Sequence, residues 1–281
     1  MIQSKGTEMA NTTAQTGYAP VNGLNLYYET HGGGGQPLVL LHGGLGTIDA
    51  MFGQLLPSLA ETRQVIGVEL QAHGHTADSD RPLRFELMAD DIAALITHLG
   101  LANADILGYS LGGGVALQTA IRHPNVVRRL VLVSTPCKRD GWYPEVLAGM
   151  AAMNAEAAQA MVASPVYAAY AGVAPQPENW PTLVAKLGQL LREDYDWSRD
   201  VAAMRAPALI VMGDADSVRT AHAVEMFGLL GGGKADGAMG GMPNSRLAML
   251  PDTTHFTTLA RTELLLPIVT AFLAAPMPDA Q

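Results

Sequence analysis

The pentapeptide Gly-Tyr-Ser-Leu-Gly at residues 108–112 places a serine where it could act as a nucleophile. An apolar, strand-like run at 104–108 leads into it, and a helical pattern follows at 111–123. A serine at such a sharp turn is held in a strained backbone conformation above the sheet, at the positive end of a helix. The flanking glycines leave room for close approach of the backbone. The alternative is a serine that only caps the helix. Ser110 is the candidate nucleophile.

A serine hydroxyl is a poor nucleophile near neutral pH and needs a base. Among the eight histidines, His255 follows a strand expected at 246–250 by a short polar loop, 251–254, and precedes the helix expected at 263–273. This placement sets His255 apart from the other histidines as a possible base. Four others lie beside a glycine loop or near helix ends, where structural or exposed roles are expected: His31, His98, His123 and His222. The remaining three, His42, His73 and His75, lie in turns that follow expected strands.

A base of this kind needs a carboxylate that fixes its tautomer and stabilises the imidazolium. The strand expected at 207–213 is followed by Asp214-Ala215-Asp216. Because parallel strands present their carboxyl ends to one edge of a sheet, both aspartates are candidates. Asp140, which follows the strand expected at 126–134, is a more distant alternative.

The elements that must position these residues alternate along the chain. Two strand-like segments, 18–21 and 24–29, are separated by Asn22-Gly23, which predicts a hairpin. The apolar run 37–41 is typical of a strand buried on both faces. Alternating strand and helix patterns then predict a parallel sheet covered by helices on both faces. The further strands are expected at 64–70, 104–108, 126–134, 207–213 and 246–250, and the helices at 85–99, 111–123, 219–230 and 263–273.

The alternation stops between about 139 and 200, where only helical patterns occur, with many Ala, Met and aromatic residues. We therefore expect a helical cap at 139–200, inserted after the sixth strand into a core domain of 17–138 and 201–281. A cap of this composition must bury its apolar face, so the pocket beneath it should be apolar. Residues 1–16 are expected to form a flexible tail, and 231–245 a flexible surface loop.

Five motifs occur in an order and spacing that resemble the α/β-hydrolase superfamily, in its branch of small bacterial esterases, lactonases and cofactor-free perhydrolases. The resemblance covers roughly residues 18–275. It implies an α/β-hydrolase fold, in which a mostly parallel central sheet is flanked by helices and carries a helical cap. The motifs are LLHGG (40–44), ELQAHGHT (69–76), GYSLGGG (108–114), MGDAD (212–216) and PDTTHF (251–256).

The resemblance also implies roles for individual residues. The family's catalytic histidine comes from the loop before its last helix, which selects His255 as the base. The family's acid stands three residues after the glycine that ends its strand, which selects Asp216. The family's His-Gly turn after the third strand implies a structural role for His42. The backbone N–H groups of Gly44 and Leu111 would form the oxyanion hole. Two residues depart from the family pattern after the fourth strand, namely Glu69 where Asp is usual and Ala72 where Gly is usual. These departures concern the geometry of that turn and not the chemistry.

Composition and charge limit the classes of partner and cofactor that we expect for this protein. Apolar residues make up 48% of the 281 residues and the net charge is −9, so we expect a large core and neither nucleic acid nor membrane as a partner. Cys137 is the single cysteine, which precludes an intramolecular disulfide. The amino-terminal residues lack a secretory signal and no apolar run reaches about 18 residues, which favours a soluble cytoplasmic protein. No HExxH or GxGxxG motif is present, so no metal or cofactor is expected.

The sequence therefore predicts a cofactor-free serine hydrolase that cleaves small apolar carboxylic esters through an acyl-enzyme. A lactonase would use the same residues, and so would a perhydrolase or haloperoxidase in which peroxide replaces water. A binding protein without activity is a further alternative, which the intact candidate triad disfavours. Serine rather than aspartate at position 110 argues against dehalogenase and epoxide hydrolase chemistry. Assembly into a homo-oligomer stays open.

Overall fold

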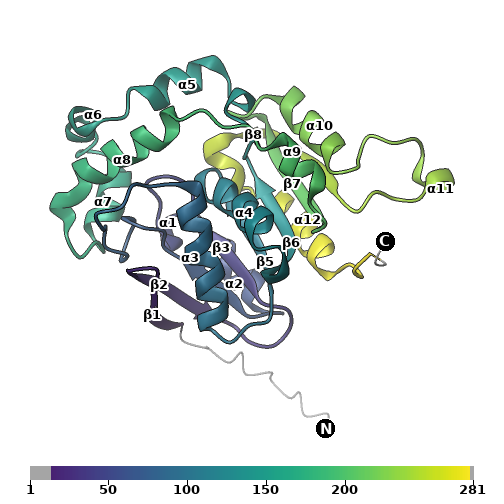
Figure 1. Cartoon of the computed structure of the whole chain (residues 1–281), viewed down its shortest axis with the longest axis horizontal. Coiled ribbons are helices and arrows are strands. Elements are labelled where there is room, and N and C mark those ends of the chain that lie inside the picture. Colours follow the sequence, from purple (N-terminus) through teal and green to yellow (C-terminus); the bar gives the residue numbers. More distant parts are fainter. Residues whose placement is uncertain (1–13, 279–281) are drawn as a thin grey trace, which may run out of the picture.

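The computed structural model describes residues 14–278 and contains an eight-stranded sheet with helices on both faces (Figure 1). The strand order is β1-β2-β4-β3-β5-β6-β7-β8. The pairs β1–β2 and β2–β4 are antiparallel, and all the others are parallel. The predicted fold class is thus confirmed. The strands are β1 (Gln15–Val21), β2 (Leu24–His31), β3 (Leu38–Leu41), β4 (Val65–Val68), β5 (Ala104–Tyr109), β6 (Val127–Val133), β7 (Ala208–Ala215) and β8 (Arg246–Thr254).

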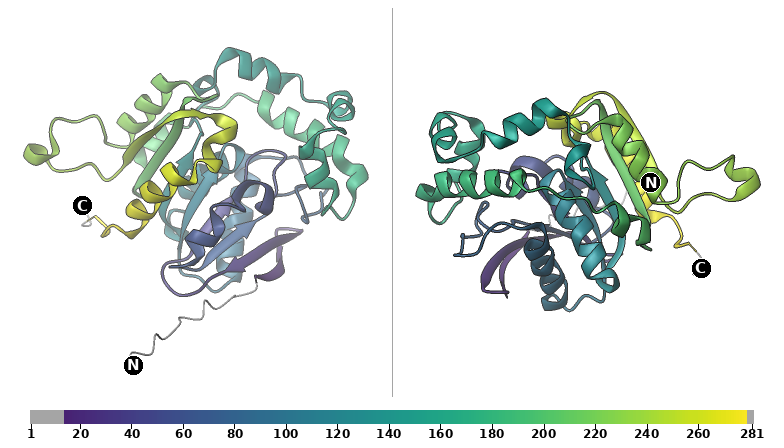
Figure 2. Two further views of the ribbon diagram at one scale, coloured as in Figure 1. Left: turned by 180° about the vertical axis from the view of Figure 1, so that it is seen from behind. Right: turned by 45° about the horizontal axis from the view of Figure 1, so that its top comes forward.

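Both faces of the central strands are buried by helices. Leu38 and Leu40 pack into one apolar cluster, and Val39 and Leu41 into the other, as alternation along a strand requires. Figure 2 shows the two helix layers from behind and in a tilted view. One face is covered by α1 (Ile48–Phe52), α2 (Leu56–Ala60) and α12 (Thr262–Ala274), and the other by α3 (Phe85–His98), α4 (Leu111–Arg122) and α10 (Thr220–Leu229). The short helices α1 and α2 were not predicted, because five residues are too few to show a helical period.

The predicted hairpin is present at the amino-terminal edge of the sheet. Val21 pairs with Leu24, and Asn22 and Gly23 both have positive φ, as a two-residue hairpin turn requires. The strand β1 begins at Gln15, so the predicted tail of 1–16 is wrong at its last two residues, whose backbones pair with β2. The rest of the predicted tail, 1–13, lies outside the described residues.

A group of helices follows β6, in the part of the chain where a cap was predicted. They lie together at one end of the molecule, beyond the carboxyl ends of the parallel strands (Figure 1). The connections into and out of this group lie side by side, since Trp197 donates a backbone hydrogen bond of 2.9 Å to Cys137. The helices are α5 (Pro144–Ala151), α6 (Ala155–Ala160), α7 (Pro165–Ala171) and α8 (Trp180–Arg192), and α9 (Ser198–Ala203) then crosses the predicted boundary at 200. The division of the chain into domains stays a prediction.

The last strand is longer than predicted. Residues 251–254, expected as a loop, belong to β8, and Thr254 pairs with Ala215 of β7. The Asp214 carboxylate accepts hydrogen bonds of 3.0 Å from the backbone N–H groups of Asp252 and Thr253, which holds this end of the strand in place. The glycine-rich residues 231–245 extend away from the body and include the short helix α11 (Gly237–Gly240) (Figure 1). The predicted flexibility of this segment stays a prediction.

Candidate active site

The candidate nucleophile lies at the tight turn between β5 and α4. Ser110 has φ of 53° and ψ of −115°, a strained conformation for a residue with a side chain. A Cβ atom on Gly108 would lie 2.3 Å from the carbonyl oxygen of Gly112, and one on Gly112 would lie 2.2 Å from that of Leu41. The two glycines of the motif are therefore required by close backbone packing, and the turn lifts the serine hydroxyl above the sheet edge.

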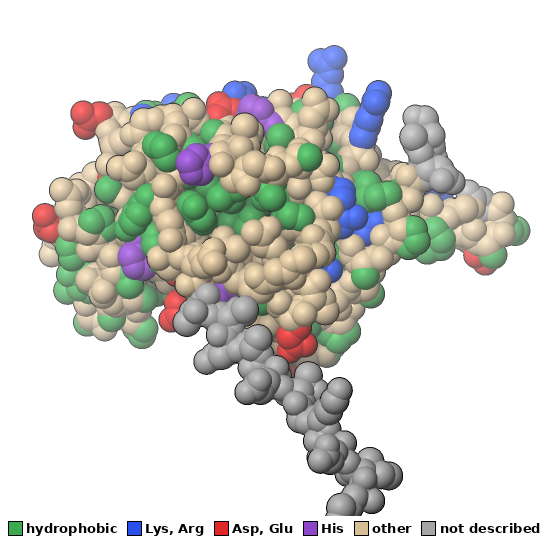
Figure 3. All heavy atoms as spheres, turned by 90° about the horizontal axis from the view of Figure 1, so that it is seen from below, with side chains coloured by type: hydrophobic (Ala, Val, Ile, Leu, Met, Phe, Trp, Pro, Cys, Tyr) green, Lys and Arg blue, Asp and Glu red, His purple; other side chains and the backbone are tan. Residues whose placement is uncertain are grey.

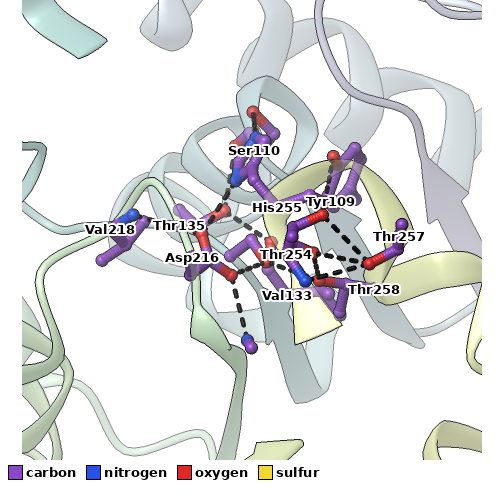
Figure 4. A network of polar contacts seen from close by, with 12 residues as sticks. Tyr109, Ser110, Val133, Thr135, Asp216, Val218, Thr254, His255, Thr257 and Thr258 are labelled. Carbon is purple, nitrogen blue, oxygen red and sulfur yellow. Dashed lines mark hydrogen bonds and ion pairs between the residues drawn. The ribbon is translucent and has the colours of Figure 1, made fainter. Parts of the chain in front are cut away.

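Three side chains from three strand ends meet at this edge (Figure 4). The Nε2 atom of His255 lies 3.1 Å from Oγ of Ser110, and its Nδ1 atom lies 2.9 Å from Oδ1 of Asp216. A carboxylate at Nδ1 favours the tautomer with the proton on that nitrogen, which leaves Nε2 free to accept the serine proton. The structure thus brings together the three residues that sequence analysis selected.

The carboxylate of Asp216 is held at both oxygens. Oδ1 also accepts a hydrogen bond of 3.1 Å from the backbone of Val218, and Oδ2 accepts bonds from Ser134 Oγ at 2.6 Å and Gly213 N at 3.1 Å. Burial by itself would raise the pKa of Asp216, but the hydrogen bond and the charge of His255, with the donors on Oδ2, outweigh burial and lower it. Asp216 therefore stays ionised beside the imidazole.

The other two candidate acids lie elsewhere. The Asp214 side chain is exposed and bonds to the backbone of β8 as described above. The carboxylate of Asp140 is exposed and pairs with Arg219 at 2.9 Å. His255 has a hydrogen bond to neither, among the bonds found in residues 14–278. Only Asp216, of the three, has the geometry to orient the base.

Two neighbours of the triad were missed by sequence analysis. Ser134, the first residue after β6, donates to Asp216 and has φ of 53°. The hydroxyl of Tyr109 donates a bond of 2.8 Å to the backbone carbonyl of His255. Ser134 could have been found by the rule that selected the aspartates, because it too stands at the carboxyl end of a parallel strand. The role of Tyr109 depends on a contact 146 residues along the chain, for which the sequence has no signal.

The predicted oxyanion-hole residues flank the serine. No hydrogen bond from the backbone N–H of Gly44 or Leu111 is found within the described part of the chain, so both donors are uncommitted. The turn that contains Gly44 is fixed by its neighbours, since the Gly43 carbonyl accepts from His42 Nδ1 at 2.8 Å and from Gly46 N at 3.1 Å. Two fixed N–H groups beside a nucleophile are suited to stabilising a developing oxyanion.

The turn after β4 shows how the chain accommodates its departures from the family pattern. The buried carboxylate of Glu69 accepts hydrogen bonds from the backbone of Ile48 at 3.3 Å and from N and Nδ1 of His75 at 2.5 and 2.8 Å. Ala72 has φ of 67°, a conformation that glycine would adopt without strain. The longer acidic side chain therefore secures the turn, at the cost of one strained alanine.

Two histidines buried beneath this site are held in the neutral form. Desolvation lowers the pKa of His42 to about 3 and that of His73 to about 4. In the unfolded chain both would titrate near 6.5. The unfolded state thus binds more protons below that pH, and stability present at neutral pH is lost as the pH falls.

Between pH 7 and pH 5 we expect the free energy of unfolding to fall by about 2 kcal/mol for each of these histidines. Urea denaturation at both pH values measures it. His73→Asn should remove roughly half of the combined effect, whereas His98→Gln, at an exposed position on α3, should leave it unchanged. The same pH dependence in His73→Asn and wild type would contradict the assignment.

A small cavity of about 50 Å³ adjoins the nucleophile. Its wall includes Ser110 together with Gly44 and Leu111, and the rest is mainly apolar. A larger cavity of about 580 Å³ lies at the amino ends of β7 and β8, beside Arg129, and contains no member of the triad. That end is part of the face in Figure 3, where apolar side chains gather in the middle and basic side chains lie beside them and along the upper edge. Because Ser110 lies in its wall, the smaller cavity is the candidate substrate site, although it is not the larger of the two.

Residues 14–278 contain no group of three or more His, Cys, Asp or Glu side chains placed to hold a metal ion. Within the same residues, no helix combines the length and the apolar character that crossing a membrane requires.

Known proteins resemble this chain in sequence and in structure. Over 132 residues it is 29% identical to a putative esterase/lipase of Haemophilus influenzae, covering 46% of this chain and 45% of the relative. Over 114 residues it is 46% identical to a pimeloyl-[acyl-carrier protein] methyl ester esterase of Neisseria meningitidis, covering 40% of this chain and 42% of the relative. The chain thus matches less than half the length of these two relatives.

The whole fold is shared with solved structures. The enol-lactonase from Burkholderia xenovorans superimposes with a TM-score of 0.69 at 22% identity, covering 92% of this chain and all of the other. The model of the family described as alpha/beta hydrolase fold matches residues 36–194, which is more than half of the sequence. The chain therefore belongs to the alpha/beta hydrolase fold family.

Proposed function

We propose that this protein is a cofactor-free carboxylic ester hydrolase with a Ser110–His255–Asp216 triad. Oγ of Ser110 attacks the ester carbonyl carbon while Nε2 of His255 takes the hydroxyl proton. The proton passes to the leaving alcohol as the carbon–oxygen ester bond breaks, and an acyl-serine ester remains. His255 then takes a proton from water, which attacks the acyl carbon. The bond from that carbon to Oγ breaks, His255 returns the proton to Oγ of Ser110, and the carboxylic acid is released.

The observation that carries this proposal is the continuous contact from Asp216 through His255 to Ser110, at 2.9 and 3.1 Å. The negative charge on the tetrahedral intermediate would be held by the backbone N–H groups of Gly44 and Leu111. Relatives named as esterases support the same reaction class. Lactones would react through the same atoms, so they belong in the substrate screen beside open esters.

The proposed substrates are small, uncharged esters. The side chains around the cavity are apolar or neutral, including Phe85, Trp142, Met150 and Leu187. A charged substrate would lose its hydration there without gaining a partner, which costs several kcal/mol by order of magnitude. Each buried CH₂ group of a neutral substrate instead contributes about 0.8 kcal/mol.

We expect kcat/KM for p-nitrophenyl esters to rise from acetate to butyrate and to fall for longer chains. The gain per CH₂ should be about fourfold. One water-sized group needs roughly 10–15 Å³ of cavity volume. A cavity of about 50 Å³ therefore has room for the three carbons of a butyryl chain beyond its carbonyl. Initial-rate kinetics over the C2–C8 esters measure this.

A matched pair of substrates tests the charge preference. A neutral diester should be cleaved faster than the corresponding monoester that carries a free carboxylate. The reverse order would contradict an apolar pocket and point to a cationic group at the site. A complete lack of ester hydrolysis over the whole series would contradict the proposed function.

A further inference from the structure

Tyr195 belongs to the wall of the cavity beside the nucleophile, and its hydroxyl proton has no acceptor among the described residues. A phenol can donate one hydrogen bond and also accept. Here the oxygen accepts a bond of 3.3 Å from Nε1 of Trp142, another residue of the same wall. Among the bonds found in residues 14–278, none is donated by the Tyr195 hydroxyl.

The rest of the cavity offers an incoming molecule little else to bind through a side chain. Thr135 is a further hydroxyl in the wall, but it donates to the backbone carbonyls of Ser110 at 2.9 Å and Val133 at 3.1 Å. Burial raises the pKa of Tyr195, so its phenol is a neutral donor throughout the physiological range. Apart from Ser110, Tyr195 is thus the side chain among the described residues of this wall that can still donate a hydrogen bond to a ligand.

The Tyr195 ring is held in place. It stacks on Trp197 with 4.4 Å between ring centroids and lies 5.6 Å from Phe85. Its backbone carbonyl accepts a hydrogen bond of 2.9 Å from Arg139, which joins the two ends of the helical segment. A donor fixed in this way loses little conformational freedom when a ligand binds, so its hydrogen bond can contribute to selectivity.

The cavity is on the acyl side of the substrate. The leaving alcohol must lie within reach of His255, which protonates it. The cavity wall contains Ser110, Gly44 and Leu111, but His255 is not part of it. A substrate whose carbonyl is placed for attack would therefore direct its acyl chain into the cavity and its alcohol toward His255.

We propose that Tyr195 is a specificity-determining residue that donates a hydrogen bond to an oxygen within a short acyl chain. This inference rests on the proposed ester hydrolysis and refines its substrate class to esters of small, neutral, oxygen-bearing acids, such as alkoxy or keto acids. An acyl group that lacks the oxygen excludes solvent from this half-buried hydroxyl without offering it an acceptor, which disfavours binding of that group.

Two esters that differ in one atom test this proposal. The p-nitrophenyl esters of butyric and methoxyacetic acid have acyl chains of equal length, and an ether oxygen replaces one CH₂ in the second. The quantity measured is the ratio of kcat/KM for methoxyacetate to that for butyrate, in wild type and in Tyr195→Phe. Because the same two esters are compared in both enzymes, their difference in intrinsic reactivity cancels.

We expect the ratio to fall about three- to tenfold in Tyr195→Phe, through slower cleavage of the methoxyacetate ester. The matched control is Tyr143→Phe, at an exposed position near α5, which should keep the wild-type ratio. Circular dichroism of each variant reports its folding.

The possible failures can be told apart. An unchanged ratio, with butyrate still cleaved, would overturn the role of Tyr195 and leave the proposed ester hydrolysis standing. An equal loss on both esters would indicate a structural role and would also overturn it. A wild-type enzyme that cleaves neither ester would overturn the proposed function and this inference together.

Discussion

Ser110→Ala is expected to lower kcat for ester hydrolysis by about 10³-fold or more while the fold stays intact. The substitution removes the oxygen that would form the acyl-enzyme in the proposed mechanism, and the positive φ at this position does not depend on the hydroxyl. The residual rate would come from the uncommitted N–H groups of Gly44 and Leu111, which can still polarise a bound carbonyl. Burst and steady-state kinetics with the butyrate ester measure the loss.

Labelling distinguishes a lost nucleophile from a distorted site. A fluorophosphonate probe should modify Ser110 in the wild type and no residue in Ser110→Ala. The control is Ser58→Ala, at an exposed position on α2, which should be labelled and should turn over like the wild type. Labelling of a different serine, or undiminished turnover in Ser110→Ala, would show that the nucleophile has been assigned wrongly.

The central sheet was predictable because its strands are apolar on both faces and its helices carry an apolar stripe. The run 37–41 has no polar face, and β3 is indeed buried on both sides. The start of β1 was not predictable in this way. Gln15 and Thr16 are polar and exposed, and they belong to the sheet only because their backbones pair with β2. Backbone pairing of this kind leaves no hydrophobic pattern in the sequence.

Sequence analysis selected Asp216, the residue in contact with His255, but by the spacing of a family motif rather than by physical argument. The rule that parallel strands end at one edge accepts both Asp214 and Asp216. What separates them is the direction of each side chain, since Asp214 turns outward to β8 and Asp216 turns inward to the imidazole. That direction depends on the register between β7 and β8, which shifts between Gly213 and Ala215. A sequence pattern does not reveal such a shift.

The contacts between the helical segment and the site are the least predictable part. Aromatic and Met residues at 139–200 predicted an apolar cover, but not which of them would face the nucleophile. In the structure, the Trp142 ring lies 5.6 Å from that of His255 in an edge-to-face arrangement, and Leu187 approaches Gly44. These contacts follow from how short helices pack on one another, and their residues carry no motif.

Asp216→Asn is expected to lower kcat by as much as about 10⁴-fold, whereas Asp214→Asn should lower it only slightly. In the wild type, Oδ1 of Asp216 accepts from Nδ1 of His255. An asparagine can present its NH₂ group to the imidazole instead, which favours the tautomer with the proton on Nε2. The base then faces Ser110 with a donor rather than an acceptor, and proton abstraction fails. Kinetics of both variants with the butyrate ester give the comparison.

Comparing Asp216→Asn with Asp214→Asn distinguishes the loss of the carboxylate charge beside His255 from a loss of folding. With its NH₂ group toward the imidazole, asparagine at 216 can still accept hydrogen bonds at its oxygen from Gly213 N and Ser134 Oγ. Only the bond from Val218 N is lost, so a cooperative thermal transition should remain. Asp214 is exposed and its bonds to Asp252 and Thr253 secure only the end of β8. A larger loss in Asp214→Asn than in Asp216→Asn would identify Asp214 as the acid. Equal small losses would mean that His255 acts without a carboxylate, because no other acidic side chain in residues 14–278 is hydrogen-bonded to its ring.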